Sequence, residues 1–231
     1  MKPRFSNQQS HAMTLTEMLV VIVVLALLVV VLLPALRPHT EPVHRSYCVN
    51  NLKEIGLSYY IWSEDHQSKF PMQVSVTNGG AMELIATGNV AACFQVMSND
   101  LSTPIILICP QDTNHFFATN FSTGFSAKNI SYFVGLDANT NSPQAFLSGD
   151  DNFAISGAPV KSGLLKLLTN SPIAWNNPRH TSYKSHFWTP ANYKSVGYIN
   201  FADGSVQEAT SYELDDYLHQ TGLATNRLAI P

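Results

Sequence analysis

An uninterrupted apolar run near the N-terminus constrains this chain more than any other feature of its sequence. Every residue from Met18 to Leu33 is apolar, and a single acid, Glu17, stands immediately before the run. The 24 residues from 13 to 36 would form roughly 36 Å of helix at about 1.5 Å per residue. A bilayer hydrocarbon core is about 30 Å thick. We therefore expect residues 13–36 to form a transmembrane helix.

The residues on either side of the apolar run predict its orientation. Lys2 and Arg4 precede it without any acid among residues 1–12, and positive charge before an apolar helix keeps that end in the cytoplasm. A secretory signal peptide would have a shorter apolar region and a small-residue cleavage site after it, whereas this run continues into Pro34-Ala35-Leu36-Arg37. We expect a single pass through the inner membrane, with residues 37–231 forming a periplasmic globular domain.

Composition supports a domain outside the cytoplasm and argues against one class of partner. Only 13% of the 231 residues are charged, and the net charge is −3 without a basic run beyond the N-terminus, so we expect no nucleic-acid partner. Cys48, Cys93 and Cys109 permit one disulfide and leave one thiol over. The pairing stays open, and three buried thiols are the alternative.

The stretch Ala12-Met13-Thr14-Leu15-Thr16-Glu17 resembles the prepilin signal of type IV pilins and type II secretion pseudopilins. Ala12 takes the place of the usual glycine before the cut, and Met13 takes the place of the usual phenylalanine after it. The resemblance implies that residues 1–12 are a leader removed by a prepilin peptidase, which also N-methylates Met13. It further implies partnership with other pilin or pseudopilin subunits and with an inner-membrane assembly platform.

The same resemblance assigns Glu17 to assembly, as the fifth residue of the mature chain. In a filament of packed helices, its carboxylate and the new α-amino group of a neighbour can neutralise each other, and such a pair is very costly to break on one side. We expect a structural subunit of a type IV pilus or a type II secretion pseudopilus. The alternative is a membrane-anchored extracytoplasmic ligand-binding module that does not polymerise.

Residues 44–66 have the periodicity of an amphipathic helix that continues the apolar one. Apolar residues recur at spacings of three to five, which is typical of one helix face; they are Tyr47, Leu52, Ile55, Tyr59 and Trp62. We expect this helix to pack on whatever follows it.

A second set of short motifs resembles the prepilin-type proteins with an H-x9-DG segment near the C-terminus. The set comprises Cys48-x-x-Asn51-Leu52-Lys53, Phe70-Pro71, Cys109-Pro110-x-Asp112, Ser131-Tyr132-Phe133-Val134, Arg179-His180 and Phe201-Ala202-Asp203-Gly204-Ser205-Val206. This chain departs from the pattern at one point, because 22 residues rather than nine separate His180 from Asp203. An insertion over residues 181–193 would account for the difference.

Strand and turn patterns follow the amphipathic segment. A short helix is expected at 81–85, strands at 105–108, 131–135 and 144–147, and a final helix at 211–219. Residues 197–201 and 205–209 predict a hairpin through Asp203-Gly204, because Asp-Gly readily adopts positive φ. The predicted fold is α+β and pilin-like, with a long N-terminal hydrophobic helix packed on a small antiparallel β-sheet with long loops.

One oxygen-rich turn is the candidate for a metal. Asp137, Asn139 and Asn141 alternate as in the opening of a calcium loop, and Asp150 follows. The glycine and glutamate of an EF-hand are missing, and Asx residues also favour turns without any ion. The eight histidines lack an HExxH or CxxC partner. We expect no enzyme activity and no cofactor apart from this candidate structural calcium.

Overall fold

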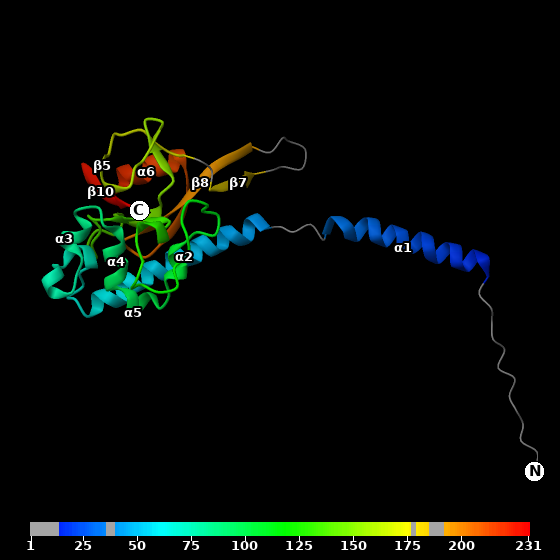
Figure 1. Ribbon diagram of the computed structural model, residues 1–231. Helices are drawn as coiled ribbons and strands as arrows, with labels where there is room; N and C mark the ends of the chain where they lie inside the picture. Colours follow the sequence, from blue (N-terminus) through cyan, green and yellow to red (C-terminus); the bar gives the residue numbers. More distant parts are fainter. Residues whose placement is uncertain (1–13, 36–39, 177–178, 185–191) are drawn as a thin grey trace, which may run out of the picture. The chain divides into compact units, whose positions relative to one another are not determined.

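The computed structural model describes residues 14–35, 40–176, 179–184 and 192–231 (Figure 1). It divides into two compact units, Met1–Thr40 and Glu41–Pro231. The first contains helix α1 (Leu15–Ala35), and the second holds almost all of helix α2 (Thr40–Glu64) and everything after it. The predicted leader lies outside the described residues, as do Ala12 and Met13.

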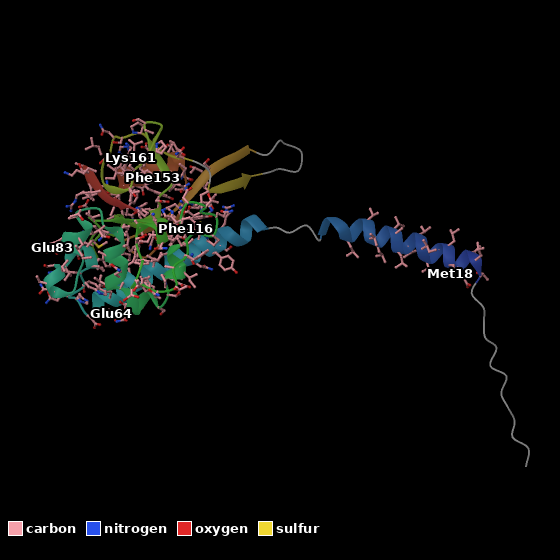
Figure 2. The ribbon with its side chains drawn as sticks, in the orientation of Figure 1. Met18, Glu64, Glu83, Phe116, Phe153 and Lys161 are labelled. Atoms are coloured by element: carbon pink, nitrogen blue, oxygen red, sulfur yellow. A yellow bond between two sulfur atoms is a disulfide. The ribbon has the colours of Figure 1, made fainter. Side chains whose placement is uncertain are left out.

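Helix α1 is apolar on every face. Its described side chains are all exposed within the chain, and the exposed fractions of the large apolar ones run from 45% at Val21 to 82% at Leu15. Figure 2 shows side chains standing out from both sides of the ribbon around Met18. Counting the described residues alone, no helix combines the length and the apolarity that crossing a membrane requires.

Helix α2 is the amphipathic segment that the sequence predicts. Leu52, Ile55 and Tyr59 are completely buried. Tyr47, expected on the same face, is 55% exposed instead, because Cys48 rather than Tyr47 begins the buried stripe that continues at Leu52, Ile55 and Tyr59. The helix ends at Glu64, and Gln67 and Ser68 then take positive φ values of 59° and 57°.

The second unit is built on an antiparallel sheet, which has seven strands in the described part of the chain. Six of them follow the order β5-β10-β1-β2-β8-β7, and β9 also pairs with β8. Their bounds are β1 (Tyr132–Gly135), β2 (Phe146–Asp150), β5 (Gly163–Leu168), β7 (His180–Lys184), β8 (Asn192–Phe201), β9 (Val206–Thr210) and β10 (Thr225–Ile230). A three-stranded sheet has the order β4 (Ala158–Pro159), β3 (Phe153–Ile155) and β6 (Ile173–Trp175).

Both faces of the large sheet are covered, and the alternation of β1 shows how. Tyr132 and Val134 belong to a core shared with α2, whereas Phe133 belongs to a second core shared with α6 (Ser211–Gln220) and the small sheet. The first core also takes in α3 (Met82–Ile85), α4 (Val90–Val96) and α5 (Ser98–Leu101). In Figure 1, α2 and α4 lie on the opposite side of the sheet from α6.

Short 3-10 turns connect these elements, at Pro71–Gln73, Val76–Asn78, Pro104–Leu107 and Ala127–Asn129. The third of them replaces the strand expected at 105–108. Pro104 begins the turn, and the Thr103 hydroxyl accepts a hydrogen bond from the Ile105 backbone N–H. Proline and a capping threonine both favour the start of a helical turn, and these local effects outweigh the β-branched composition.

The predicted pilin-like fold, a long N-terminal hydrophobic helix packed on a small antiparallel sheet, is wrong. The chain is α+β, but the sheet is large and has a second sheet beside it, and the helix in its core is the amphipathic α2. The apolar α1 is a shorter element of a separate unit. Hydropathy could not predict which of the two helices packs on the sheet, because that depends on tertiary packing and not on the length of the apolar run.

Other local predictions are confirmed. Strand β1 and helix α3 lie where they were expected, and the hairpin is formed by β8 and β9, with Gly204 at φ 82°. The C-terminal helix is α6, whose Thr210 and Glu213 form a capping box. Strand β7 pairs with β8 from His180 to Lys184, so the described ends of the segment expected as an insertion, 181–184 and 192–193, belong to the sheet.

Candidate functional site

The described part of the N-terminal unit contains one of the predicted site residues, Glu17. Its carboxylate accepts hydrogen bonds from the Thr14 backbone N–H at 2.7 Å and from the Thr14 hydroxyl at 2.8 Å. The Thr14 hydroxyl in turn accepts from the Glu17 backbone N–H at 3.3 Å. This reciprocal arrangement is a capping box, which satisfies backbone donors at the start of a helix. Glu17 therefore already has a local structural role in α1.

The second unit contains a buried ionic cluster around Arg179, a residue just before β7. Its Nη2 lies 2.9 Å from Asp112 Oδ2 and 2.6 Å from Asp151 Oδ1, and its Nη1 lies 3.6 Å from Asp150 Oδ1. Nη1 also donates to the Ser131 carbonyl at 3.0 Å. The Arg179 side chain is only 5% exposed. One guanidinium thus compensates three carboxylates in a region that water hardly reaches.

His115 lies against one side of this Arg179 cluster. Its Nδ1 lies 2.7 Å from Asp112 Oδ2, and its Nε2 lies 4.0 Å from Asp151 Oδ2. Burial alone would raise the pKa of Asp112, but the hydrogen bond from His115 and the charge of Arg179 outweigh it and lower that pKa to about 2. Asp112 is therefore held ionised.

Asp150 lies on the other side of the cluster, completely buried on β2. Its Oδ2 accepts the Tyr198 backbone N–H at 2.9 Å and lies 3.5 Å from Nε2 of His180. Burial raises the pKa of Asp150 to about 6, although Arg179 favours its ionised form. The carboxylate beside His180 is therefore Asp150. Asp203, at the hairpin turn, instead accepts the Ser205 backbone N–H.

A disulfide adjoins the cluster and settles the open cysteine pairing. Cys48 of α2 is bonded to Cys109, with a Cα–Cα distance of 5.2 Å, and Cys93 is a buried free thiol. The Cys109 Sγ lies 3.4 Å from Nε2 of His180. The Asn51 side chain donates to the Ile108 carbonyl at 3.0 Å. Helix α2 is thus tied to the segment before Pro110 by a covalent bond and a hydrogen bond.

The cluster gathers most of the second set of sequence motifs. Cys48 and Asn51 come from α2, Cys109 and Asp112 from the Cys-Pro segment, Ser131 from the start of β1, and Arg179 and His180 from the start of β7. In the sequence these motifs stand out as one ordered set, but nothing in their spacing indicates that they meet around a single arginine. Asp151 and His115 are additions that no motif indicated.

The candidate calcium residues have other partners. Both Asp137 oxygens accept from Arg227, through its backbone N–H at 2.7 Å and its Nε at 2.8 Å. Asn139 caps its own turn by accepting the Asn141 backbone N–H at 3.0 Å. Asp150 belongs to the Arg179 cluster. Within the described residues, the group of His, Cys, Asp or Glu side chains spaced for a metal ion is Cys48, Cys109 and His180.

The arrangement of the Arg179 cluster suits a structural network better than a reaction centre. Its charged groups are paired with each other and enclosed by α2 and the sheet, whereas a catalytic group must meet its substrate. An open hollow of about 430 Å³ adjoins the cluster through Tyr198, and it is lined by Arg45, Ser46, Val49, Asn50, Tyr198, Val206 and Glu208. Arg45 fills part of it, donating from Nε to the Tyr198 hydroxyl at 3.0 Å.

Comparisons with protein-family models, with curated proteins and with solved structures find no match for this chain.

Proposed function

We propose that this chain is a non-enzymatic subunit of a type IV pilus-like or type II secretion pseudopilus-like filament, assembled through its N-terminal helix. The observation that carries the proposal is the exposed surface of α1. Apolar side chains surround the helix on all faces, and one acid stands at its start. A helix that is hydrophobic all round is normally buried. A filament core made of the same helix from many copies would bury it.

Processing follows from the sequence before α1. A prepilin peptidase would cut between Ala12 and Met13 and methylate the new terminus, with the precursor held at the inner membrane by its apolar segment. Cleavage would bring a new amino terminus within a few residues of Glu17. The carboxylate could then pair with the terminus of a neighbouring subunit, and an assembly platform would add subunits one by one.

The Cys48–Cys109 disulfide supports a location outside the cytoplasm for the unit Glu41–Pro231. Disulfides form and persist in oxidising compartments and are rare in the cytosol. The basic N-terminus would stay on the cytoplasmic side, and the unit would be periplasmic before assembly.

Two substitutions at Glu17 separate its capping role from its charge. Glutamine can replace glutamate in a capping box, so Glu17→Gln keeps the cap and removes the charge, whereas Glu17→Ala removes both. We expect both variants to lose filament incorporation, measured by the fraction of protein in sheared or pelleted filaments. Glu64→Gln, a change of the same charge at an exposed site on α2, should incorporate like the wild type.

Mass spectrometry of the mature N-terminus provides the second arm of the test. The proposal expects N-methylated Met13 in a host with an active prepilin peptidase. An intact Met1 there, or wild-type incorporation of Glu17→Gln, would contradict it. Loss of processing with ligand binding retained would favour the membrane-anchored binding module instead.

A further inference from the structure

The disulfide and the imidazole next to it have the composition of a metal site. The sulfur atoms of Cys48 and Cys109 and a ring nitrogen of His180 all lie within 4.8 Å of one another, and all three residues are completely buried. Two cysteines and a histidine are ligands that zinc prefers, with Zn–S bonds of about 2.3 Å and Zn–N bonds of about 2.0–2.1 Å. Each residue comes from a different segment of the chain, so the three are brought together only when the chain folds.

The orientation of His180 matches that of a metal ligand. Its Nδ1 is hydrogen-bonded to Oε1 of Gln111. An amide oxygen can only accept, so Nδ1 carries a proton, and Nε2 lies 3.4 Å from Cys109 Sγ. In the neutral ring, Nε2 is the nitrogen that offers a lone pair to a metal. In a tetrahedral zinc site, neighbouring sulfur and nitrogen ligands are separated by roughly 3.5 Å. Metal-bound histidines commonly donate their other N–H to a carboxylate, carbonyl or water, and Gln111 supplies that contact.

The surrounding charges also accommodate a cation. Asp150 Oδ2 lies 3.5 Å from Nε2 of His180, so a buried carboxylate stands beside the ligand atom. Two thiolates would neutralise a divalent ion, and the surroundings stay net negative because Arg179 is shared among Asp112, Asp150 and Asp151. A buried charge without such compensation would be strongly unfavourable.

We propose that the reduced chain binds one zinc ion through Cys48 Sγ, Cys109 Sγ and His180 Nε2, and that forming the disulfide expels it. Cys48 and Cys109 would hold α2 against the Cys-Pro segment in both states, through a shared metal ion in one and through their disulfide in the other. The inference goes beyond filament assembly and does not depend on it.

The exchange between the two states balances with a disulfide reagent as oxidant. One thiolate attacks the reagent's S–S bond and displaces one thiolate leaving group. The second cysteine thiolate then attacks the mixed disulfide and displaces the other. Two electrons pass to the reagent, one protein disulfide forms, and the zinc ion, having lost both sulfur ligands, dissociates.

Cobalt(II) substitution tests the ligands directly. The full-length Cys93→Ser chain, reduced with a phosphine, removes the uninvolved thiol and serves as the reference. We expect one cobalt ion per chain, with thiolate-to-cobalt charge transfer and the visible bands of a tetrahedral ion. Cys48→Ser, Cys109→Ser and His180→Gln should lose this spectrum, whereas Gln111→Leu should weaken binding by about tenfold. A reduced reference chain without these bands overturns the proposal, as does an unchanged spectrum in Cys48→Ser.

A kinetic test needs no change at the ligands. Dithiodipyridine oxidises the reduced Cys93→Ser chain with release of two thiopyridones per disulfide, followed by absorbance, while a chromogenic chelator reports released zinc. At free zinc of about 100 times its Kd, about 1% of the sites are empty, so disulfide formation should slow by about 100-fold. One zinc should leave per disulfide formed. Equal rates with and without zinc would overturn the proposal.

Discussion

At the scale of single residues, Arg179 is the side chain on which the buried ionic cluster depends. It is 5% exposed and faces Asp112, Asp150 and Asp151. Arg179→Met keeps much of the apolar stem and removes the charge, leaving the three carboxylates without their shared cation. Removing one partner of a buried ion pair costs about 3–5 kcal/mol. We expect a loss of that size in the free energy of unfolding, measured by denaturant titration.

Arg227→Met is the matched control for this substitution. Arg227 also pairs with an aspartate, Asp137, but its side chain is 49% exposed, and exposed pairs contribute about 0–1 kcal/mol. If Arg179→Met lowers the free energy of unfolding no more than Arg227→Met does, then water or rearranged neighbours compensate the three carboxylates, and Arg179 is not essential to the cluster.

The pKa of Asp112 predicts how stability depends on pH. Its value is about 2 in the folded chain and 3.8 without the fold, so the unfolded state binds the proton more tightly. Asp112 therefore stabilises the fold fully above about pH 4, and its contribution of about 2 kcal/mol is lost as the pH falls toward 2. In unfolding titrations from pH 5 to 3, Asp112→Asn should show a shallower decline than the wild type. Parallel declines would contradict the assignment.

At the scale of elements, the contact between α2 and β8 depends on the missing side chain of Gly56. A Cβ there would lie 2.6 Å from Nδ2 of Asn200, and that amide donates to the Leu52 carbonyl at 2.9 Å. In an open helix, Gly→Ala stabilises by about 1 kcal/mol. Gly56→Ala should instead destabilise by about 1–3 kcal/mol, measured by thermal or denaturant unfolding.

A double-mutant cycle identifies the cause of that loss. Asn200→Ala removes the atoms that the new Cβ would meet, so Gly56→Ala should cost less in the Asn200→Ala background. We expect a coupling energy of at least about 0.5 kcal/mol, as for other residues in contact. Strictly additive losses would place the strain elsewhere.

Two neighbouring segments show why some elements could be predicted from sequence and others could not. The periodicity of α2 extends over several turns, and Leu52, Ile55 and Tyr59 are all buried as it predicts. The run Ile105-Ile106-Leu107-Ile108 is too short for periodicity to separate a strand from a helical turn. Pro104 and the Thr103 cap favour the helical turn that the structure shows. Long repetition is therefore informative, whereas short apolar runs depend on their flanking residues.

At the scale of the whole molecule, the Cys48–Cys109 disulfide closes a loop with a sequence separation of 61 residues. A loop of that length restricts the unfolded chain by about 4 kcal/mol in the chain-entropy model. Reduction in the presence of a metal chelator should lower the free energy of unfolding by about this amount. Cys48→Ser with Cys109→Ser should reproduce the loss and should not respond further to the reductant, whereas Cys93→Ser keeps the disulfide and should lose as much stability on reduction as the wild type. Equal stability before and after reduction would contradict a closed loop.

The candidate site could be predicted only in part, because its residues meet through tertiary packing. The motifs containing Cys48, Cys109 and His180 were visible, but no spacing rule joins a helix, a corner and a strand start so far apart. His115 joins the Arg179 cluster through Asp112, three residues before it. Many turns contain an Asp and a His at this spacing, so the spacing alone does not indicate the cluster. Glu17 was the opposite case, since its significance was visible in sequence and its capping contacts were not.

The place of β10 in the sheet determines when the unit can finish folding. Residues Thr225–Ile230 lie between β5 and β1 and pair with both, yet the ribosome makes them after every other described strand. Until they arrive, β1 and β5 each present an unpaired edge, which invites pairing with other chains. A chain delivered N-terminus first therefore cannot complete this sheet before residues 225–230 arrive, and without them β1 has an open edge and β5 has no partner in the sheet.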